Sequence, residues 1–204
     1  MFPHRIISGG QTGVDRAALD VAMELGIPIG GYLSRGRQDE NDDVLPDKYI
    51  GMQETETDDV NVRTELNVQE SDATLIVSHG ELFGGSEYTE LMARKHGKPC
   101  LHIDFDRHDV DQAVLLVSAW LSETQPRVLN IAGPRASDDP EIYCQVKCVL
   151  VGALASDQSP RSEIVEEADP DKRPACPVCG GQLLDIRRKL CCVQCHSIIE
   201  TCCE

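Results

Sequence analysis

The 204-residue sequence has no apolar stretch that approaches the length needed to cross a membrane. Near its N-terminus it also lacks the charged and apolar regions of a secretion signal, so we expect a cytoplasmic protein without membrane contacts. Basic residues are scarce, because 19 Lys and Arg stand against 35 Asp and Glu, giving a formal net charge of −16. Contacts to nucleic-acid phosphates depend on clustered Lys and Arg, so this balance argues against nucleic acid as a partner.

What is present is enough for a globular domain with an appendage. Apolar residues make up 41% of the chain, which is sufficient for the core of one domain of ordinary size. The chain also has ten cysteines. Without a secretion signal, they indicate metal ligation or redox chemistry rather than a disulfide framework.

Residues 4–25, HRIISGGQTGVDRAALDVAMEL, combine a β-branched run, a glycine turn and an amphipathic helix. Apolar residues recur at helical spacing from Val14, and Gly26 stands where a left-handed C-terminal residue is favoured. Thr12 and Asp15 form a capping-box pattern at the helix start. The glycines would let backbone N–H groups approach a phosphate at the positive end of the helix dipole. The alternative is a simple tight turn, because the segment has neither G-x-G-x-x-G nor a P-loop ending.

Strands and helices alternate beyond this segment. Further strands are predicted at Ile27–Leu33, Ala73–Ser78, Pro99–Ile103 and Val128–Ala132, and helices at 86–96, 110–121 and about 139–155. The alternation predicts an α/β fold, a Rossmann-like doubly wound parallel sheet of about five strands. Glycine loops follow the first and third predicted strands. For both loops to meet one ligand, those strands should be neighbours, which favours the order 2-1-3-4-5.

Two more loops resemble anion-binding helix starts. In residues 78–90, three glycines free the backbone, Ser86 can cap the next helix, and Thr89 is expected in its first turn. In residues 130–135, NIAGPR, a glycine permits close approach and Arg135 can reach a ligand.

The link at 34–71 is too long for an ordinary connection, so it is expected to be functional. Its middle, 53–59, is acidic and expected to be solvated. Arg35 and Arg63 near its ends could close over an anion, whereas Arg37 is equally well explained as surface charge. The ligand-binding residues predicted from all these segments are Gly9, Gly10, Gln11, Thr12, Gly13, Asp15, Arg16, Arg35, Arg63, Thr64, Asn67, Gly80, Gly84, Gly85, Ser86, Thr89, Asn130, Gly133, Pro134 and Arg135.

Several blocks of the sequence resemble, in order, the "putative molybdenum carrier" family. They are ISGGQTGVDRAALD at 7–20, RTE-x-NV at 63–68, SDATLI at 71–76, GGS at 84–86 and NIAGPR at 130–135. This resemblance covers roughly residues 4–155. It implies a place in the Rossmann-like superfamily that includes the cytokinin-activating phosphoribohydrolases, the lonely-guy enzymes. It also implies a phosphorylated small-molecule ligand, either the molybdenum cofactor or a nucleotide.

The same resemblance bears on enzymatic activity. In the phosphoribohydrolases the second glycine motif is PGGxGTxxE, and its Glu acts on the ribosyl bond. Here Leu91 stands at that position, with Glu90 one residue and Glu87 four residues away. Ligand binding or carriage is therefore favoured, and nucleotide N-ribosyl hydrolysis is the alternative. A homo-oligomer is also expected.

The composition changes after residue 155, so we expect a ligand-binding domain at 1–155, an acidic linker at 156–174 and a small module at 175–204. Two C-x2-C pairs separated by a hairpin-like segment resemble a zinc ribbon, because four thiolates at that spacing can converge on Zn²⁺. A structural zinc is predicted, and redox dithiols are the alternative. The module could also dock a protein partner. Its predicted zinc ligands are Cys176, Cys179, Cys192 and Cys195, with Cys191 and His196 as rivals.

Overall fold

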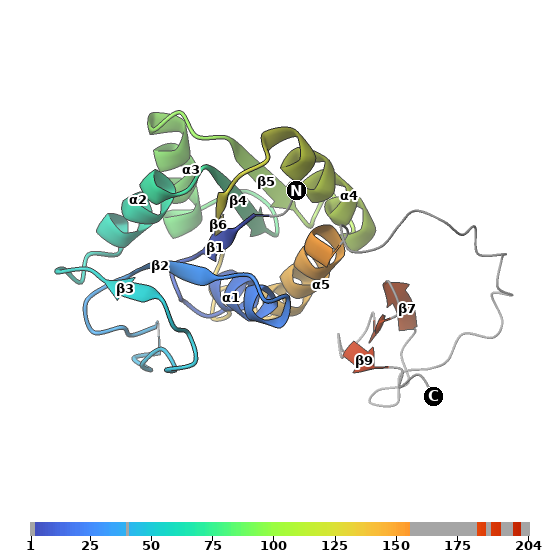
Figure 1. The fold of residues 1–204 in the computed structure, drawn as a ribbon, viewed down its shortest axis with the longest axis horizontal. Helices are drawn as coiled ribbons and strands as arrows, with labels where there is room; N and C mark the ends of the chain where they lie inside the picture. Colours follow the sequence, from blue (N-terminus) through green and yellow to red (C-terminus); the bar gives the residue numbers. More distant parts are fainter. Residues whose placement is uncertain (1–2, 40, 156–182, 187–188, 193–197, 201–204) are drawn as a thin grey trace, which may run out of the picture. The chain divides into compact units, whose positions relative to one another are not determined.

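The protein divides into two units, Met1–Asp157 and Gln158–Glu204, which are described separately. The computed structural model describes residues 3–39, 41–155, 183–186, 189–192 and 198–200 (Figure 1). Among these residues, no helix is long and apolar enough to span a membrane.

A six-stranded parallel sheet forms the centre of the first unit (Figure 1). Its strands are β1 (Arg5–Ile7), β2 (Ile29–Leu33), β3 (Met52–Glu54), β4 (Ala73–Ser78), β5 (Cys100–Asp104) and β6 (Val128–Ala132). The α/β fold and the predicted strands are confirmed. β4 is buried along its whole length, as expected of a strand covered on both faces. The prediction of about five strands omitted β3, which pairs with β2 in parallel register.

The strand order is β3-β2-β1-β6-β4-β5, so the predicted order 2-1-3-4-5 was wrong: the last predicted strand, β6, is inserted between β1 and β4, which are therefore not neighbours. β6 lies between β1 and β4, pairing Ile6 with Leu129 on one side and Leu75 with Ile131 on the other. The connection from β4 to β5 moves outward, and the connection from β5 to β6 returns across β4. Both crossovers remain right-handed only if their helices lie on opposite faces.

Five helices cover the sheet in two groups (Figure 1). They are α1 (Val14–Glu24), α2 (Val60–Glu70), α3 (Gly84–Lys95), α4 (Val110–Thr124) and α5 (Ile142–Leu154). On one face α5 packs against both α1 and α4, and on the other α2 packs against α3. The main core lies under the first group and includes Ile6, Leu75 and Ile131, all with no exposed surface. Burial of such side chains stabilises the fold by about 1.5–3 kcal/mol each.

The start of α1 differs from the predicted capping box. Its N-cap is Gly13, at φ 70°, and no side chain caps the helix. The Asp15 carboxylate instead accepts a hydrogen bond from the Gln11 backbone N–H at 3.2 Å. At the other end of the helix the prediction is confirmed, because Gly26 adopts φ 69° and donates to the Met23 carbonyl.

The long link at 34–71 contains regular structure that the sequence did not reveal. β3 forms within it, and α2 begins after Asp59, whose side chain accepts a hydrogen bond from the Asn61 N–H at 2.9 Å. Asn67 then ties α2 to the sheet, because its side chain accepts from the Tyr32 N–H at 2.8 Å and donates to the Tyr32 carbonyl at 3.2 Å. These two bonds fix the face that α2 presents to the rest of the unit.

The second unit has a three-stranded antiparallel sheet of β7 (Leu183–Ile186), β8 (Lys189–Cys192) and β9 (Ile198–Glu200). The β7–β8 pairing forms a hairpin between the two cysteine pairs of the predicted ribbon. Cys176, Cys179 and Cys195 lie outside the described residues, as does the 156–174 linker. Cys192 ends β8, but its side chain is likewise outside them. The zinc site stays a prediction.

Candidate functional site

A cleft of about 820 Å³ lies where the loops after β1, β6 and β4 meet the start of α2. Because β6 is inserted between β1 and β4, the three glycine loops follow three adjacent strands. This is the edge at which open α/β sheets bind ligands. The lining residues are Gln11, Asp15, Val60, Asn61, Arg63, Thr64, Phe83, Gly84, Gly85, Ser86, Glu87, Tyr88, Thr89, Glu90, Leu91, Arg94, Ala132, Gly133, Pro134, Arg135 and Asp138.

Buried polar residues and exposed apolar residues line this cleft together. Gln11, Asp15, Ser86 and Thr89 are all buried. In contrast, Phe83 is 59% exposed. Val60 and Leu91 are other exposed apolar residues of the lining. A concave lining that combines apolar side chains with a few placed polar groups is typical of a small-molecule site.

Arg63 is the central basic group of the cleft. It extends from α2, and its Nη1 lies 3.8 Å from the Asp15 carboxylate. Burial lowers the pKa of the guanidinium, the Asp15 charge raises it, and the neighbouring Arg135 charge lowers it again. The buried Nε–H has no hydrogen-bond partner within the described residues. Arg63 therefore retains an unused buried donor, and Arg135 is a second cation near it.

Gln11 is a second buried group with unused hydrogen-bonding capacity. It lies on the loop after β1 and its side-chain N–H donates to the Gln38 carbonyl at 3.3 Å. Its Oε1 has no partner in the described part of the chain. Leaving such a buried atom unpaired costs about 1–3 kcal/mol. This cost is offset if a water or ligand donates to Oε1.

The start of α3 supplies the remaining donors. Its N-cap is Phe83 and no side chain caps it, so Ser86 is not the cap that the sequence predicted. Ser86 lies in the first turn instead, and Thr89 lies in the second, where its hydroxyl donates to the Gly85 carbonyl at 2.8 Å. The Ser86 N–H donates to the Phe83 carbonyl at 3.2 Å, which leaves the Gly84 and Gly85 N–H groups without an acceptor among the described residues. The helix dipole favours an anion there.

Eleven of the twenty predicted ligand-binding residues line this cleft. They are Gln11, Asp15, Arg63, Thr64, Gly84, Gly85, Ser86, Thr89, Gly133, Pro134 and Arg135. Gly9, although not a lining residue, lies against Arg63: a Cβ at Gly9 would be 1.7 Å from Nη1.

Other predicted residues hold the loops together. Thr12 Oγ1 accepts a hydrogen bond from the Ala136 N–H at 2.9 Å. A Cβ on Gly13 would lie 2.5 Å from the Pro134 carbonyl oxygen, so this glycine permits the loops after β1 and β6 to touch. At Gly10, φ is +73° and a Cβ would lie 2.5 Å from Leu33, in the core. A side chain at Gly10 would thus disturb the fold rather than occupy a phosphate site.

The remaining predicted residues lie away from the cleft. Arg16 donates to the Gly10 carbonyl at 2.9 Å and pairs with Asp39 at 3.3 Å. Asn130 is buried in β6, where its Nδ2 donates a hydrogen bond to Thr74 Oγ1 at 3.4 Å. The Gly80 N–H donates a hydrogen bond to the Asp104 carboxylate at 2.7 Å. The Asn67 side chain is hydrogen-bonded to the Tyr32 backbone, and Arg35 is exposed.

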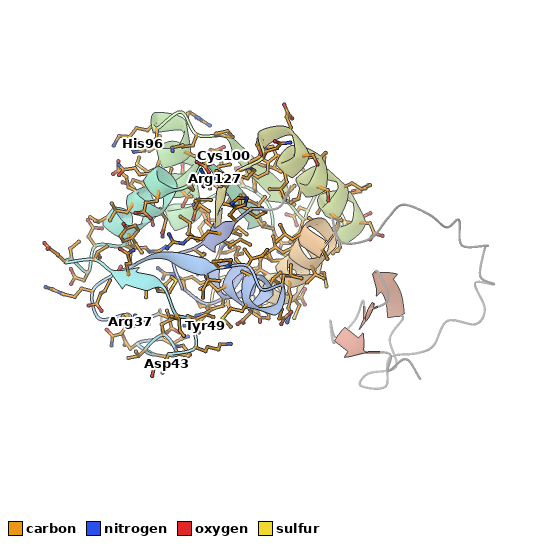
Figure 2. All side chains as sticks on the ribbon, in the orientation of Figure 1. Arg37, Asp43, Tyr49, His96, Cys100 and Arg127 are labelled. Carbon is orange, nitrogen blue, oxygen red and sulfur yellow. The ribbon has the colours of Figure 1, made fainter. Side chains whose placement is uncertain are left out.

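Arg37 and the link loop also lie apart from the cleft lining. Figure 2 shows Arg37 in the same loop region as Asp43 and Tyr49, beside β3. The Arg37 carbonyl accepts from the Leu45 N–H at 2.8 Å, so its backbone closes this loop. Surface charge, the alternative interpretation of Arg37, fits this position.

Sequence reasoning missed several lining residues, including Tyr88, Arg94 and Asp138. Tyr88 and Arg94 belong to α3, whose spacing could have placed Arg94 on the same side as Glu90 and Leu91, which also line the cleft. Val60 and Asn61 could not be placed, because α2 itself was not predicted.

A parallel sheet with helices on both faces and a glycine-loop cleft at the carboxyl ends of its strands is a Rossmann-like arrangement. Residues 6–154 match the Circularly permutated YpsA SLOG family, and the chain belongs to that family. It is also similar to the 1.45 Å crystal structure of a protein from Syntrophus aciditrophicus SB described as "Putative molybdenum carrier protein". The two are 50% identical with a TM-score of 0.72, over 74% of this chain and 95% of that chain. No curated protein matches the chain.

Proposed function

We propose that the first unit binds and carries a phosphorylated small molecule, with the phosphate between the start of α3 and the guanidiniums of Arg63 and Arg135. The observation that supports this most strongly is the charge balance at the cleft floor. The Arg135 charge lowers the pKa of the Arg63 guanidinium, and Asp15 is the carboxylate paired with Arg63. Among the described residues, Arg135 makes no ion pair.

A phosphate would satisfy this arrangement. It would accept hydrogen bonds from the Arg63 Nε–H, from Arg135 and from the first N–H groups of α3. Charge-assisted bonds of this kind are the stronger class, and the helix start adds a favourable dipole. A carboxylate fits less well, because it offers fewer acceptor oxygens to donors that converge from α2, α3 and the loop after β6.

The rest of the ligand is proposed to be a pterin or a nucleotide. The related protein's name points to molybdenum, and the molybdenum cofactor is a phosphorylated pterin. The cleft's volume of about 820 Å³ is within the range for such ligands. Exposed Phe83 and Leu91 on the rim would contact a ring.

Gly85 offers the sharpest test of the anion site. A Cβ at this position meets nothing within 4 Å, and Gly85 lies in the first turn of α3. Gly85→Asp should therefore fold normally, and its charge suits the helix dipole. The same charge should reduce phosphate affinity by roughly tenfold or more, measured by titration calorimetry with inorganic phosphate and GMP. Gly85→Ala is the matched control. Equal affinities for the two variants would contradict the proposal.

Nucleotide N-ribosyl hydrolysis is the second candidate, because Glu87 and Glu90 line the same cleft. The Glu90 carboxylate forms an ion pair with Arg94 Nη2 at 3.4 Å, and this pair lies at the rim of the cleft. Leu91, at the position of the phosphoribohydrolase acid, is 52% exposed and cannot transfer a proton. Incubation with nucleoside monophosphates, followed by chromatography for free base, decides the matter. Base release that Glu90→Gln abolishes would establish hydrolysis, and a flat time course favours carriage.

A further inference from the structure

A second hollow, of about 520 Å³, adjoins the main cleft. It shares Phe83, Pro134 and Asp138 with that cleft, so the two hollows have a common wall. Its own residues come from the loop after β4 and from the segment that leads into α5. They are His79, Asp139, Pro140 and Glu141.

His79 is held in one orientation by its neighbours. Its Nδ1 lies 2.6 Å from the Asp139 carboxylate, and its ring lies 5.4 Å from the Phe105 ring. With Nδ1 donating to a carboxylate, the neutral imidazole has its lone pair on Nε2. Nε2 makes no hydrogen bond to any described residue, and the side chain is 30% exposed. Nε2 is thus an oriented ring nitrogen of the hollow lining, and it accepts a hydrogen bond in the neutral form of His79.

Carboxylates add to the acceptors here. Asp138 and Glu141 are exposed, and neither forms an ion pair within the described residues. The other surfaces are apolar: the two prolines, and Phe83 at 59% exposure. An anion would be repelled from this hollow, whereas the floor of the main cleft attracts one. The two parts of the site therefore differ in the chemistry they accept.

We propose that this hollow binds the heteroaromatic ring of the ligand through an edge of amino and ring N–H donors, as in guanine or a pterin. This inference rests on the proposed phosphate site. The ring would stack on Phe83, a contact that any planar base can make. The donors of the ring would reach Asp138, Glu141 and His79 Nε2. Ionised carboxylates only accept hydrogen bonds, and Nε2 accepts one in the neutral tautomer whose hydrogen is on Nδ1. Specificity then comes from the donor edge, because the stacking contact does not distinguish bases.

GMP and IMP test the proposal, because they differ only by the 2-amino group. Titration calorimetry of the full chain should show GMP binding roughly tenfold or more tightly than IMP, the usual effect of a hydrogen bond to a charged group. In the Asp138→Asn, Glu141→Gln double variant the preference should fall to within about twofold. His79→Ala should also lower the preference for GMP over IMP, whereas His96→Ala, at the end of α3, should leave this preference unchanged.

The possible outcomes separate this inference from the proposed function. If GMP and IMP bind equally and both depend on Arg135, the phosphate site is real and the donor-edge inference is wrong. If the preference persists in the double variant, the ring lies elsewhere. If neither nucleotide nor inorganic phosphate binds the wild-type chain, the proposed function itself fails. Circular dichroism on each variant establishes that it is folded.

Discussion

Gly9 and Arg63 are in direct contact, because a Cβ on Gly9 would lie 1.7 Å from the Arg63 Nη1 and 2.6 Å from its Cζ. Gly9 does not have a positive φ, so the requirement for glycine here is space and not backbone conformation. The first glycine after β1 makes room for a guanidinium that comes from α2. Gly9, predicted to admit a ligand, thus makes room for the side chain that we propose binds the phosphate.

Gly9→Ala should therefore displace Arg63 and weaken phosphate binding by roughly tenfold. Strain from the added methyl should also cost about 1–3 kcal/mol of stability, measured by urea unfolding. In an Arg63→Ala background the same change should cost less, because the contacts with the guanidinium are gone and the contact with Asp15 Oδ2, at 2.9 Å, remains. Additive losses in this double-mutant cycle would show that Gly9 acts independently of Arg63.

Arg135→Ala should weaken phosphate or GMP binding by about 1.5–3 kcal/mol, because a charge-assisted hydrogen bond is lost. Arg94→Ala is the matched control, since Arg94 lines the same cleft but lies at its rim beside Glu90. Calorimetry at low ionic strength gives both values. If only the Arg94 variant loses affinity, the anion lies at the outer end of the cleft.

The Asp20 carboxylate should make the first unit sensitive to acid. Burial raises its pKa, but hydrogen bonds from Lys48, Tyr143 and Tyr49 together outweigh burial and lower it. A folded-state pKa below the unfolded value, about 3.9, gives stability that is present above that pH and lost as pH falls through the folded pKa. Asp20→Asn should thus lose stability at pH 7 but show a smaller further loss between pH 5 and about 3. Urea unfolding of the variant and of the wild-type chain across this range measures the two slopes, and equal slopes would contradict the prediction.

Removal of zinc should affect the two units differently. If Cys176, Cys179, Cys192 and Cys195 bind Zn²⁺, chelation should unfold the second unit, because so small a module depends on its metal. Phosphate binding by the first unit should persist. Elemental analysis should find about one zinc per chain, and Cys176→Ser should lose it. Zinc content that is unchanged in this variant would exclude the four-cysteine site.

The sequence was most informative about features that depend on one helix or strand alone. The bounds of β4 and β6 were predicted correctly because continuous apolar runs mark buried strands. The strand order depends on how distant elements pack, so nothing local could place β6 beside β1. The capping box failed for a related reason: Asp15 pairs with Arg63, which lies 48 positions away in the sequence.

The candidate site was predicted in its loops and at the start of α3, whereas α2 was not predicted as a helix. In the loops, Gln11, Gly133, Pro134 and Arg135 were predicted and line the cleft. α2 is mostly polar, with only Thr64, Asn67 and Val68 buried, so its pattern gave no helical signal. Asp59 was the available clue, because an acidic side chain that caps a helix start is a local feature.

The position of β6 also determines when the first unit can be completed during synthesis. β1 pairs with Val128–Ala132, so the centre of the sheet joins residues more than 120 positions apart. While a ribosome is still making the middle of the chain, β1 and β4 have no strand between them, and the edges that β6 will cover stay open. The apolar residues of these edges must then be kept from other chains until translation passes residue 132, a demand that chaperones meet for slowly assembled parallel sheets.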